Sequence, residues 1–245
     1  MAAVGFEGET DPALVREVDS LEWVRVGQLS RMIRSLASRG VRRCVMLGQI
    51  APRNLFDVRP DIRAMGLLLR LREKNAHTLF GAIGDELTKD GIELIPAVPW
   101  LSPWMPGAGY RAGAALTSKS LEDIRYGFRI AKEIARLEIG QMVVVREGTT
   151  LAVEGFEGTD ACIERGGGLA GKAGGAVAVK LSKAGHDLRF DIPCIGPKTV
   201  ETCARSGVAV MAFEAGMTLL IDREELETLV RTLCVSLVAV DAESP

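Results

Sequence analysis

The sequence predicts an α/β protein of two domains, residues 1–115 with a parallel sheet and residues 116–245 with mixed α/β structure. Helix-like and strand-like patterns alternate between residues 26 and 97, which is typical of a parallel α/β layer. Residues 99–113 are rich in Pro, Gly and Trp, as a linker or a long loop is. From Gln141 onward the strand-like patterns come in closer pairs.

In the N-terminal domain, the first predicted helix spans residues 26–39. Apolar residues recur at helical spacing from Val26 to Leu36, and Gly40 ends the pattern. The same reasoning predicts a buried strand at residues 41–48, helices at residues 62–75 and 78–90, and a strand at residues 92–97.

The C-terminal domain is expected to begin with a helix at residues 120–137, capped by Ser120 and acidic in its first turn. Two short apolar runs at residues 142–147 and 150–155 flank Gly148-Thr149 and predict a β-hairpin. The remaining predicted elements are strands at residues 176–181, 208–213 and 217–221 and helices at residues 198–205 and 224–234.

Composition excludes several classes of protein. The net charge of −2 argues against a dedicated nucleic-acid surface, which is normally basic. The five cysteines are odd in number and form no Cys-x-x-Cys, which favours reduced thiols over a disulfide framework or a zinc ribbon. The chain starts without the pattern of a secretory signal, and no apolar stretch reaches the roughly 20 residues that cross a bilayer. We therefore expect a cytoplasmic protein.

Acidic residues gather in a glycine-bounded segment after the predicted hairpin, where Glu154, Glu157 and Asp160 lie within seven residues. Carboxylates at strand ends, beside small residues, suit a divalent cation and a phosphate ester. Thr159 and Asp160 also begin a predicted helix, and the free N–H groups of a helix N-terminus favour an anion. The alternative is a solvated turn in which one of these two residues is only an N-cap.

A second acidic segment contains Asp187, Arg189 and Asp191 at alternating positions. If this segment is extended, the three side chains project from one face. The carboxylates would then hold a cation or orient a water molecule, and the guanidinium would bind phosphate oxygens. The alternative is a surface ion-pair strip worth about 0–1 kcal/mol. His186, beside this segment, is a weaker candidate for an acid or a base.

Two glycine-containing segments are further candidates for phosphate binding. Residues 196–199, Gly-Pro-Lys-Thr, open a predicted helix and are a second candidate phosphate site, with ordinary capping as the alternative. Residues 166–173 nearly match a P-loop, but Ala173 stands where Ser or Thr must ligate magnesium. This difference argues against a Walker-type ATPase and leaves a flexible glycine loop over the substrate open.

Taken together, these segments resemble the LpxI-type UDP-2,3-diacylglucosamine pyrophosphatases. The resemblance is carried by residues 140–145, 151–154, 157–160, 187–193, 195–197 and 199, and by residues 26–28 and 59–61. It spans most of the chain. The resemblance implies an N-terminal Rossmann-like domain and a C-terminal domain special to the family. We expect the Rossmann-like domain to lack its first strand, because residues 3–6 resemble a later one.

The resemblance also implies Mg²⁺-dependent hydrolysis of UDP-2,3-diacylglucosamine to UMP and 2,3-diacylglucosamine 1-phosphate in lipid A synthesis. The catalytic residues that it implies are Asp191, Asp187 and Asp160, and these three with Glu157 are the expected metal ligands. The expected substrate-binding residues are Arg189, Lys198, Thr199, Thr159 and Gly158.

The lipid part of such a substrate needs an apolar crevice, which we expect between the domains. Leu101, Trp104 and Met105 are candidates for its lining, and ordinary packing between domains is the alternative. We expect no nucleic-acid partner. Peripheral contact with the inner membrane surface and a homodimer both stay open.

Two other functions stay open at this point. A non-catalytic module that binds a nucleotide sugar would show binding without turnover. A nicotinamide-dependent enzyme would need Gly-x-Gly-x-x-Gly between a strand and a helix, and the N-terminal region contains no such pattern.

Overall fold

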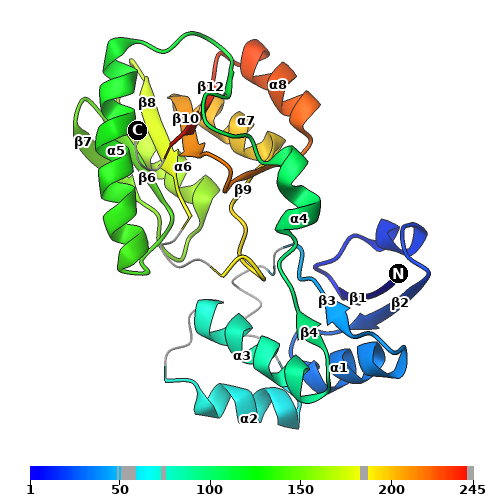
Figure 1. Ribbon diagram of the computed structural model, residues 1–245. Coiled ribbons are helices and arrows are strands. Elements are labelled where there is room, and N and C mark those ends of the chain that lie inside the picture. The colour runs from blue at the N-terminus through cyan, green and yellow to red at the C-terminus, as the bar shows by residue number, and fades with distance from the viewer. Residues whose placement is uncertain (49, 51–58, 73–75, 183–186, 242–245) are drawn as a thin grey trace. The chain divides into compact units, whose positions relative to one another are not determined.

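Figure 1 shows the computed structural model, which describes residues 1–48, 50, 59–72, 76–182 and 187–241. The chain forms two compact units, Met1–Ala97 with Asp187–Asp191, and Val98–His186 with Ile192–Pro245. Residues 98–115, which we expected in the first domain, thus belong to the second unit. The reason is that β5 (Arg111–Ala112) pairs with the C-terminal strand β12 (Ser236–Val240).

The first unit combines parallel strand pairs with helices, as the alternating patterns predicted. Its elements are β1 (Ala2–Phe6), η1 (Pro12–Arg16), β2 (Ser20–Val24), α1 (Leu29–Ser38), β3 (Arg43–Cys44), α2 (Ile62–Arg70), α3 (Ala76–Lys89) and β4 (Glu93–Leu94). Strand β1 pairs with β2, and β3 pairs with β4. The two strands that we expected at residues 41–48 and 92–97 are only two residues long, because the parallel pairing covers only that length.

An ion cluster joins α2 to α3 in this unit. The Glu86 carboxylate, on α3, accepts hydrogen bonds from Arg63 (2.7 Å) and Arg70 (2.8 Å) of α2 and from Lys89 (2.5 Å) of α3. The hydrogen bonds from Lys89 and Arg63 contribute most to lowering the pKa of Glu86, which falls to about 2. Because Glu86 is 5% exposed, removing one of its partners would leave a poorly solvated charge.

The second unit is built on one six-stranded mixed sheet in the order β5-β12-β10-β8-β6-β7. The strands not yet defined are β6 (Met142–Arg146), β7 (Thr149–Val153), β8 (Ala176–Lys180) and β10 (Val208–Glu214). Strands β8, β10 and β12 run parallel, whereas β6 is antiparallel to both β7 and β8. Strand β7 therefore points the same way as β8, and their carboxyl ends lie at one edge of the sheet.

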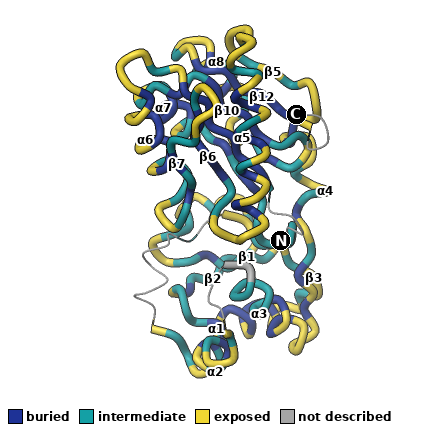
Figure 2. The backbone as a smooth tube through the Cα atoms, turned by 90° about the vertical axis from the view of Figure 1, so that its left-hand side faces the viewer, coloured by how far each residue is buried: buried dark blue, intermediate teal, exposed yellow. Residues whose placement is uncertain are grey.

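Helices cover both faces of this sheet (Figure 1). They are α5 (Ser118–Arg136), α6 (Thr159–Leu169), α7 (Pro197–Ser206) and α8 (Arg223–Thr232). Successive strand residues point to opposite faces. On β6, Met142 and Val144 pack with α6, α7 and α8, whereas Val143 and Val145 pack with α5. Figure 2 shows the strands as the most deeply buried part of this unit.

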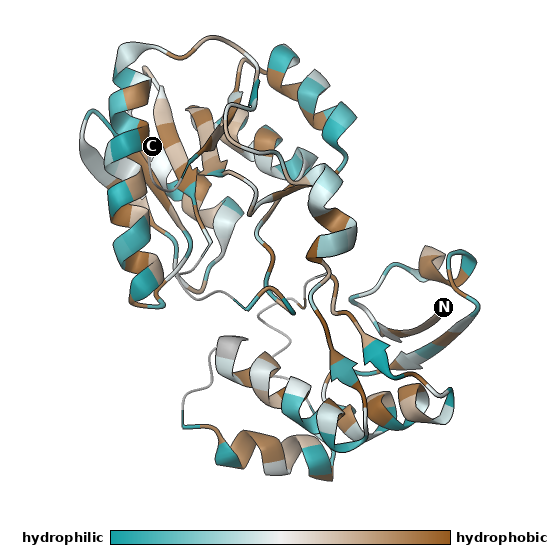
Figure 3. Ribbon diagram, viewed as in Figure 1, coloured by the Kyte–Doolittle hydropathy of each residue, from teal (hydrophilic) through white to brown (hydrophobic). Residues whose placement is uncertain are grey.

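Two short segments and one further strand pair complete the second unit. The expected loop at residues 99–113 contains α4 (Val98–Leu101), η3 (Ser102–Trp104) and β5. Strands β9 (Cys194–Ile195) and β11 (Leu219–Leu220) pair in parallel. Polar and apolar residues alternate along α5 in Figure 3, as expected for a helix with one buried face. Within the described ranges, no helix is both long and apolar enough to cross a bilayer.

Of the glycines in the P-loop-like segment, residues 166–168 are part of α6, so the flexible loop that the sequence left open does not include them, whereas Gly171 lies beyond the helix. A Cβ on Gly166 would lie 2.5 Å from the Val144 Cβ, and a Cβ on Gly167 would lie 2.1 Å from the backbone oxygen of Ser206, at the end of α7. Both distances are far below any real Cβ contact. The glycines therefore let α6 approach β6 and α7 closely, and this packing offsets the roughly 1 kcal/mol that each glycine costs a helix relative to alanine.

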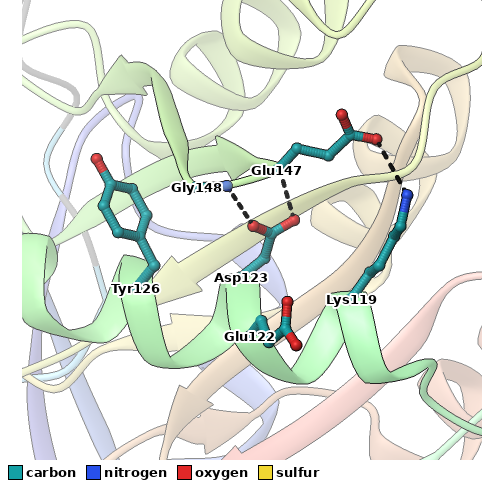
Figure 4. A pocket seen from close by; sticks show the side chains of 6 residues that line it. All are labelled: Lys119, Glu122, Asp123, Tyr126, Glu147 and Gly148. Carbon is teal, nitrogen blue, oxygen red and sulfur yellow. Dashed lines mark hydrogen bonds and ion pairs between the residues drawn. The ribbon is translucent and has the colours of Figure 1, made fainter.

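The predicted hairpin is present as β6 and β7, with Glu147 and Gly148 as its two turn residues. Both have positive φ, 48° and 70°, as a type I′ turn requires. Figure 4 shows how the Asp123 carboxylate, on α5, stabilises this turn by accepting hydrogen bonds from both turn amides, at 2.9 Å and 2.8 Å. The carboxylate thereby occupies one side of the shallow hollow that these residues form with Lys119, Glu122 and Tyr126.

Glu147 is strained in this turn, since a residue with a Cβ costs about 1–2 kcal/mol in the left-handed region. Asparagine tolerates that region, so Glu147→Asn should raise the free energy of unfolding by about 0.5–1 kcal/mol. Urea unfolding measures the change. Glu147→Gln is the matched control because it removes the charge and keeps the strain. Equal stability of the two variants would contradict this account of the turn.

The Glu86 cluster predicts an acid-dependent loss of stability. A carboxyl group with a lowered pKa stabilises the folded state above its unfolded pKa of about 4.3, and this contribution disappears as the pH falls toward about 2. Glu86→Gln should therefore be less stable than the wild type at pH 7 and should lose less stability between pH 5 and pH 2. Urea unfolding across this range tests it, with the exposed Glu93→Gln as control. Parallel pH profiles for the wild type and Glu86→Gln would refute the prediction.

Candidate active site

The N-termini of α6 and α7 lie together at the carboxyl edge of the second unit's sheet. Helix α6 follows β7 and begins at Thr159, and α7 begins at Pro197, as the sequence predicted for both. The residues before them, Gly158 and Gly196, offer no side chain, and no described side chain caps either helix. The carboxyl edge of a parallel sheet is where ligands bind in open α/β folds, and uncapped helix N-termini attract anions.

Asp160 joins these two helix starts. Its Oδ1 accepts a hydrogen bond from the Thr199 hydroxyl at 3.2 Å, and its Oδ2 lies 3.1 Å from the Lys198 Nζ. The Asp160 side chain is 28% exposed and the Lys198 side chain is 79% exposed. Three of the expected site residues are thus brought together, as a carboxylate, an ammonium group and a hydroxyl between two positive helix ends.

The Thr159 side chain points into a buried network instead of toward solvent. Its hydroxyl accepts a hydrogen bond from the Lys180 Nζ (3.1 Å) and donates one to the Glu154 Oε1 (2.8 Å). The Lys180 Nζ also donates to the backbone oxygen of Cys194 at 3.0 Å. Sequence reasoning did not single out Lys180. One pattern in the sequence could have indicated Lys180: it ends a strand whose other residues are all small and apolar.

Glu157, an expected metal ligand, braces the loop before α6. Its carboxylate forms an ion pair with Arg165 and accepts a hydrogen bond from the Gly155 amide at 3.1 Å. Its own backbone amide and Arg165 hold the pKa of Glu157 below its ordinary value. Glu157 and Asp160 are close in the sequence but have different partners: Arg165 and the Gly155 amide for Glu157, and Lys198 and Thr199 for Asp160.

The second acidic segment forms a turn in the first unit, so the expected extended conformation is wrong. The amides of Phe190 and Asp191 both donate to the backbone oxygen of Asp187 at 3.2 Å. The Phe190 ring packs on Phe80 of α3, with 5.7 Å between ring centroids. This contact between residues distant in the sequence holds the turn against α3, and local alternation gives no sign of it.

Within this turn, Asp187 and Arg189 pair with each other. The Asp187 carboxylate accepts from the Arg189 Nε at 2.8 Å and from a terminal guanidinium nitrogen at 2.5 Å. These hydrogen bonds raise the pKa of Arg189. Asp191 ends the turn and is half-buried. The Asp187 carboxylate thus has the Arg189 guanidinium as its neighbour.

The other residues considered from the sequence add little to the site. His186 lies outside the described residues. Met105 is buried and Trp104 is 50% exposed, both in the second unit. Burial raises the pKa of the Cys162 and Cys203 thiols to about 12, which keeps them protonated and unsuited as nucleophiles. Among the described residues, no group of three or more His, Cys, Asp or Glu side chains converges on one point.

The oxygen donors nevertheless suit magnesium. Mg²⁺ usually keeps several waters and binds through one or two protein carboxylates together with phosphate oxygens, so it needs no cage of protein ligands. Asp160, in the second unit, and Asp191, in the first, each supply a hard carboxylate oxygen. Both carboxylates therefore have the chemistry of a magnesium ligand.

Comparison with known proteins agrees with the resemblance noted in the sequence. The model of the LpxI N-terminal domain matches residues 1–103, and the model of the LpxI C-terminal domain matches residues 107–238. The UDP-2,3-diacylglucosamine pyrophosphatase LpxI of Caulobacter vibrioides is 30% identical over 229 residues, which cover 90% of this chain and 82% of that protein. The chain therefore belongs to the LpxI family.

Proposed function

We propose that this chain hydrolyses the diphosphate of UDP-2,3-diacylglucosamine to UMP and 2,3-diacylglucosamine 1-phosphate, with Mg²⁺, in lipid A synthesis. Membership of the family and the name of the Caulobacter relative support this reaction. The observation that carries it in this chain is the pair of uncapped helix N-termini, joined by Asp160, Lys198 and Thr199.

The position of Asp160 supports the part that magnesium has in this proposal. Helix N-termini and Lys198 attract the phosphate oxygens of a diphosphate, whereas a carboxylate repels them. A carboxylate is therefore unfavourable at an anion site unless a cation lies between it and the ligand. Asp160 would hold the ion there, and the ion would neutralise the diphosphate and lower the pKa of a bound water.

The side chains of this chain have distinct roles in the proposed reaction. Lys198 has an exposed ammonium group that can exchange Asp160 for a phosphate oxygen. The amides at the start of α6, next to Gly158, would stabilise charge on the phosphates. We propose Asp191 as the carboxylate that the reaction needs most, because the turn anchored by Phe190 holds it rigidly.

A non-catalytic module that binds a nucleotide sugar is the alternative function. The same helix N-termini would serve such a module, because they attract phosphates whether or not a bond is broken. Release of UMP separates the two functions.

Incubation with radiolabelled UDP-2,3-diacylglucosamine and Mg²⁺ should release UMP, and EDTA should stop the release. Asp191→Asn should lower kcat by at least about 10²-fold with a small change in KM, because the lost interaction acts mainly in the transition state. Asp222→Asn is the control, since it changes an aspartate at positive φ, where asparagine is tolerated. Binding of the substrate without UMP would support the non-catalytic module, and wild-type rates in Asp191→Asn would refute the role of Asp191.

A further inference from the structure

Lys180 lies at the carboxyl end of the central strand β8 and is 8% exposed. A buried ammonium group is costly unless acceptors surround it. Lys180 has two, the Thr159 hydroxyl at 3.1 Å and the Cys194 backbone oxygen at 3.0 Å. The first belongs to the first residue of α6, and the second belongs to β9, which leads through Gly196 into α7. One side chain therefore joins both segments that carry the candidate site.

The hydrogen-bond directions in this network are determined by chemistry. The ammonium group can only donate, so the Thr159 oxygen accepts from Lys180 and its proton points to Glu154. The other Glu154 carboxylate oxygen accepts a hydrogen bond from the backbone amide of Gln141 at 3.2 Å. Glu154 is 8% exposed, so a buried carboxylate balances the buried ammonium through one hydroxyl. Each charged group in this network has hydrogen-bond partners, and such a network favours a single arrangement of the groups that it contains.

The network has a consequence for the neighbouring residue, Asp160. Lys198, the partner of Asp160 in its ion pair, is exposed, and pairs with an exposed partner contribute about 0–1 kcal/mol, too little to hold a carboxylate in one place. The buried contacts of Thr159, one residue earlier, hold the start of α6 far more firmly. The position of Asp160 relative to Thr199 therefore depends on Lys180.

We propose that Lys180 is a positioning residue: it ties the start of α6 to β9 and so holds Asp160 beside Lys198 and Thr199 in the geometry that hydrolysis needs. Its role in hydrolysis rests on the proposed function, whereas its effect on the two helix starts does not. Lys180 does not touch the substrate in this account.

The test uses the full-length protein and two readouts. Lys180→Met removes the ammonium group, and the double variant Lys180→Met/Glu154→Gln removes both buried charges, so that an unpaired carboxylate does not unfold the protein. Thr159→Val removes the bridging hydroxyl, and Thr159→Ser keeps it. Lys172→Met is the control for loss of an exposed lysine. The readouts are amide hydrogen exchange at residues 158–162 and 196–200, and kcat and KM for UMP release.

We expect the double variant and Thr159→Val to exchange these amides at least about tenfold faster. We also expect kcat to fall by about 10²-fold with a smaller change in KM, because a displacement of about 1 Å costs that much. Lys172→Met should match the wild type in both readouts, and Thr159→Ser should match it in hydrogen exchange. Slower turnover together with a proportional rise in KM would contradict a positioning role, because it would indicate lost substrate binding.

The two readouts separate failure of this inference from failure of the proposed function. If the wild-type protein releases no UMP, the proposed reaction is wrong, and hydrogen exchange alone decides whether Lys180 holds the helix starts. Unchanged exchange in the double variant and in Thr159→Val overturns the inference whatever the rates are. Faster exchange with wild-type kcat overturns the role of Lys180 in the reaction.

Discussion

The close contact of α6 with β6 and α7 is the constraint on which the rest of the second unit depends. Gly166 and Gly167 remove the side chains that would separate these elements, so that α6 and α7 pack side by side along the sheet. The starts of both helices then meet at the sheet's carboxyl edge, where Asp160 contacts Thr199 and Lys198. The anion site that we propose would thus follow from backbone packing, with Asp160, Lys198 and Thr199 at its rim.

The charges at this edge form two layers with different physical roles. Buried Lys180 and Glu154 are paired through Thr159 and determine where the helix starts lie. Exposed Lys198 and half-buried Asp160 form a weak pair that a ligand can open at little cost. This division suits a site that must bind and release a highly charged substrate. Lys180 and Glu154 do not have to rearrange when Lys198 and Asp160 exchange partners.

Much of this arrangement could be predicted from the sequence where the signal is local. The starts of α6 and α7 and the β6-β7 hairpin follow from glycine, proline and apolar spacing, and all three are present. Non-local contacts account for the errors. The turn at residues 187–191 depends on the packing of Phe190 against Phe80, and the helical state of Gly166 depends on the surface of β6. Lys180 was missed because a lysine at a strand end is ordinarily solvated, and only the fold shows that it is buried.

The central claim is that Asp160 and Thr199, which join the starts of α6 and α7, act together on the diphosphate. A double-mutant cycle on kcat tests it most directly, with Asp160→Asn, Thr199→Val and the variant that carries both. Residues that act as a unit have strongly non-additive effects, so we expect the double variant to be about as slow as the slower single variant. Losses that multiply, as for independent residues, would contradict the claim.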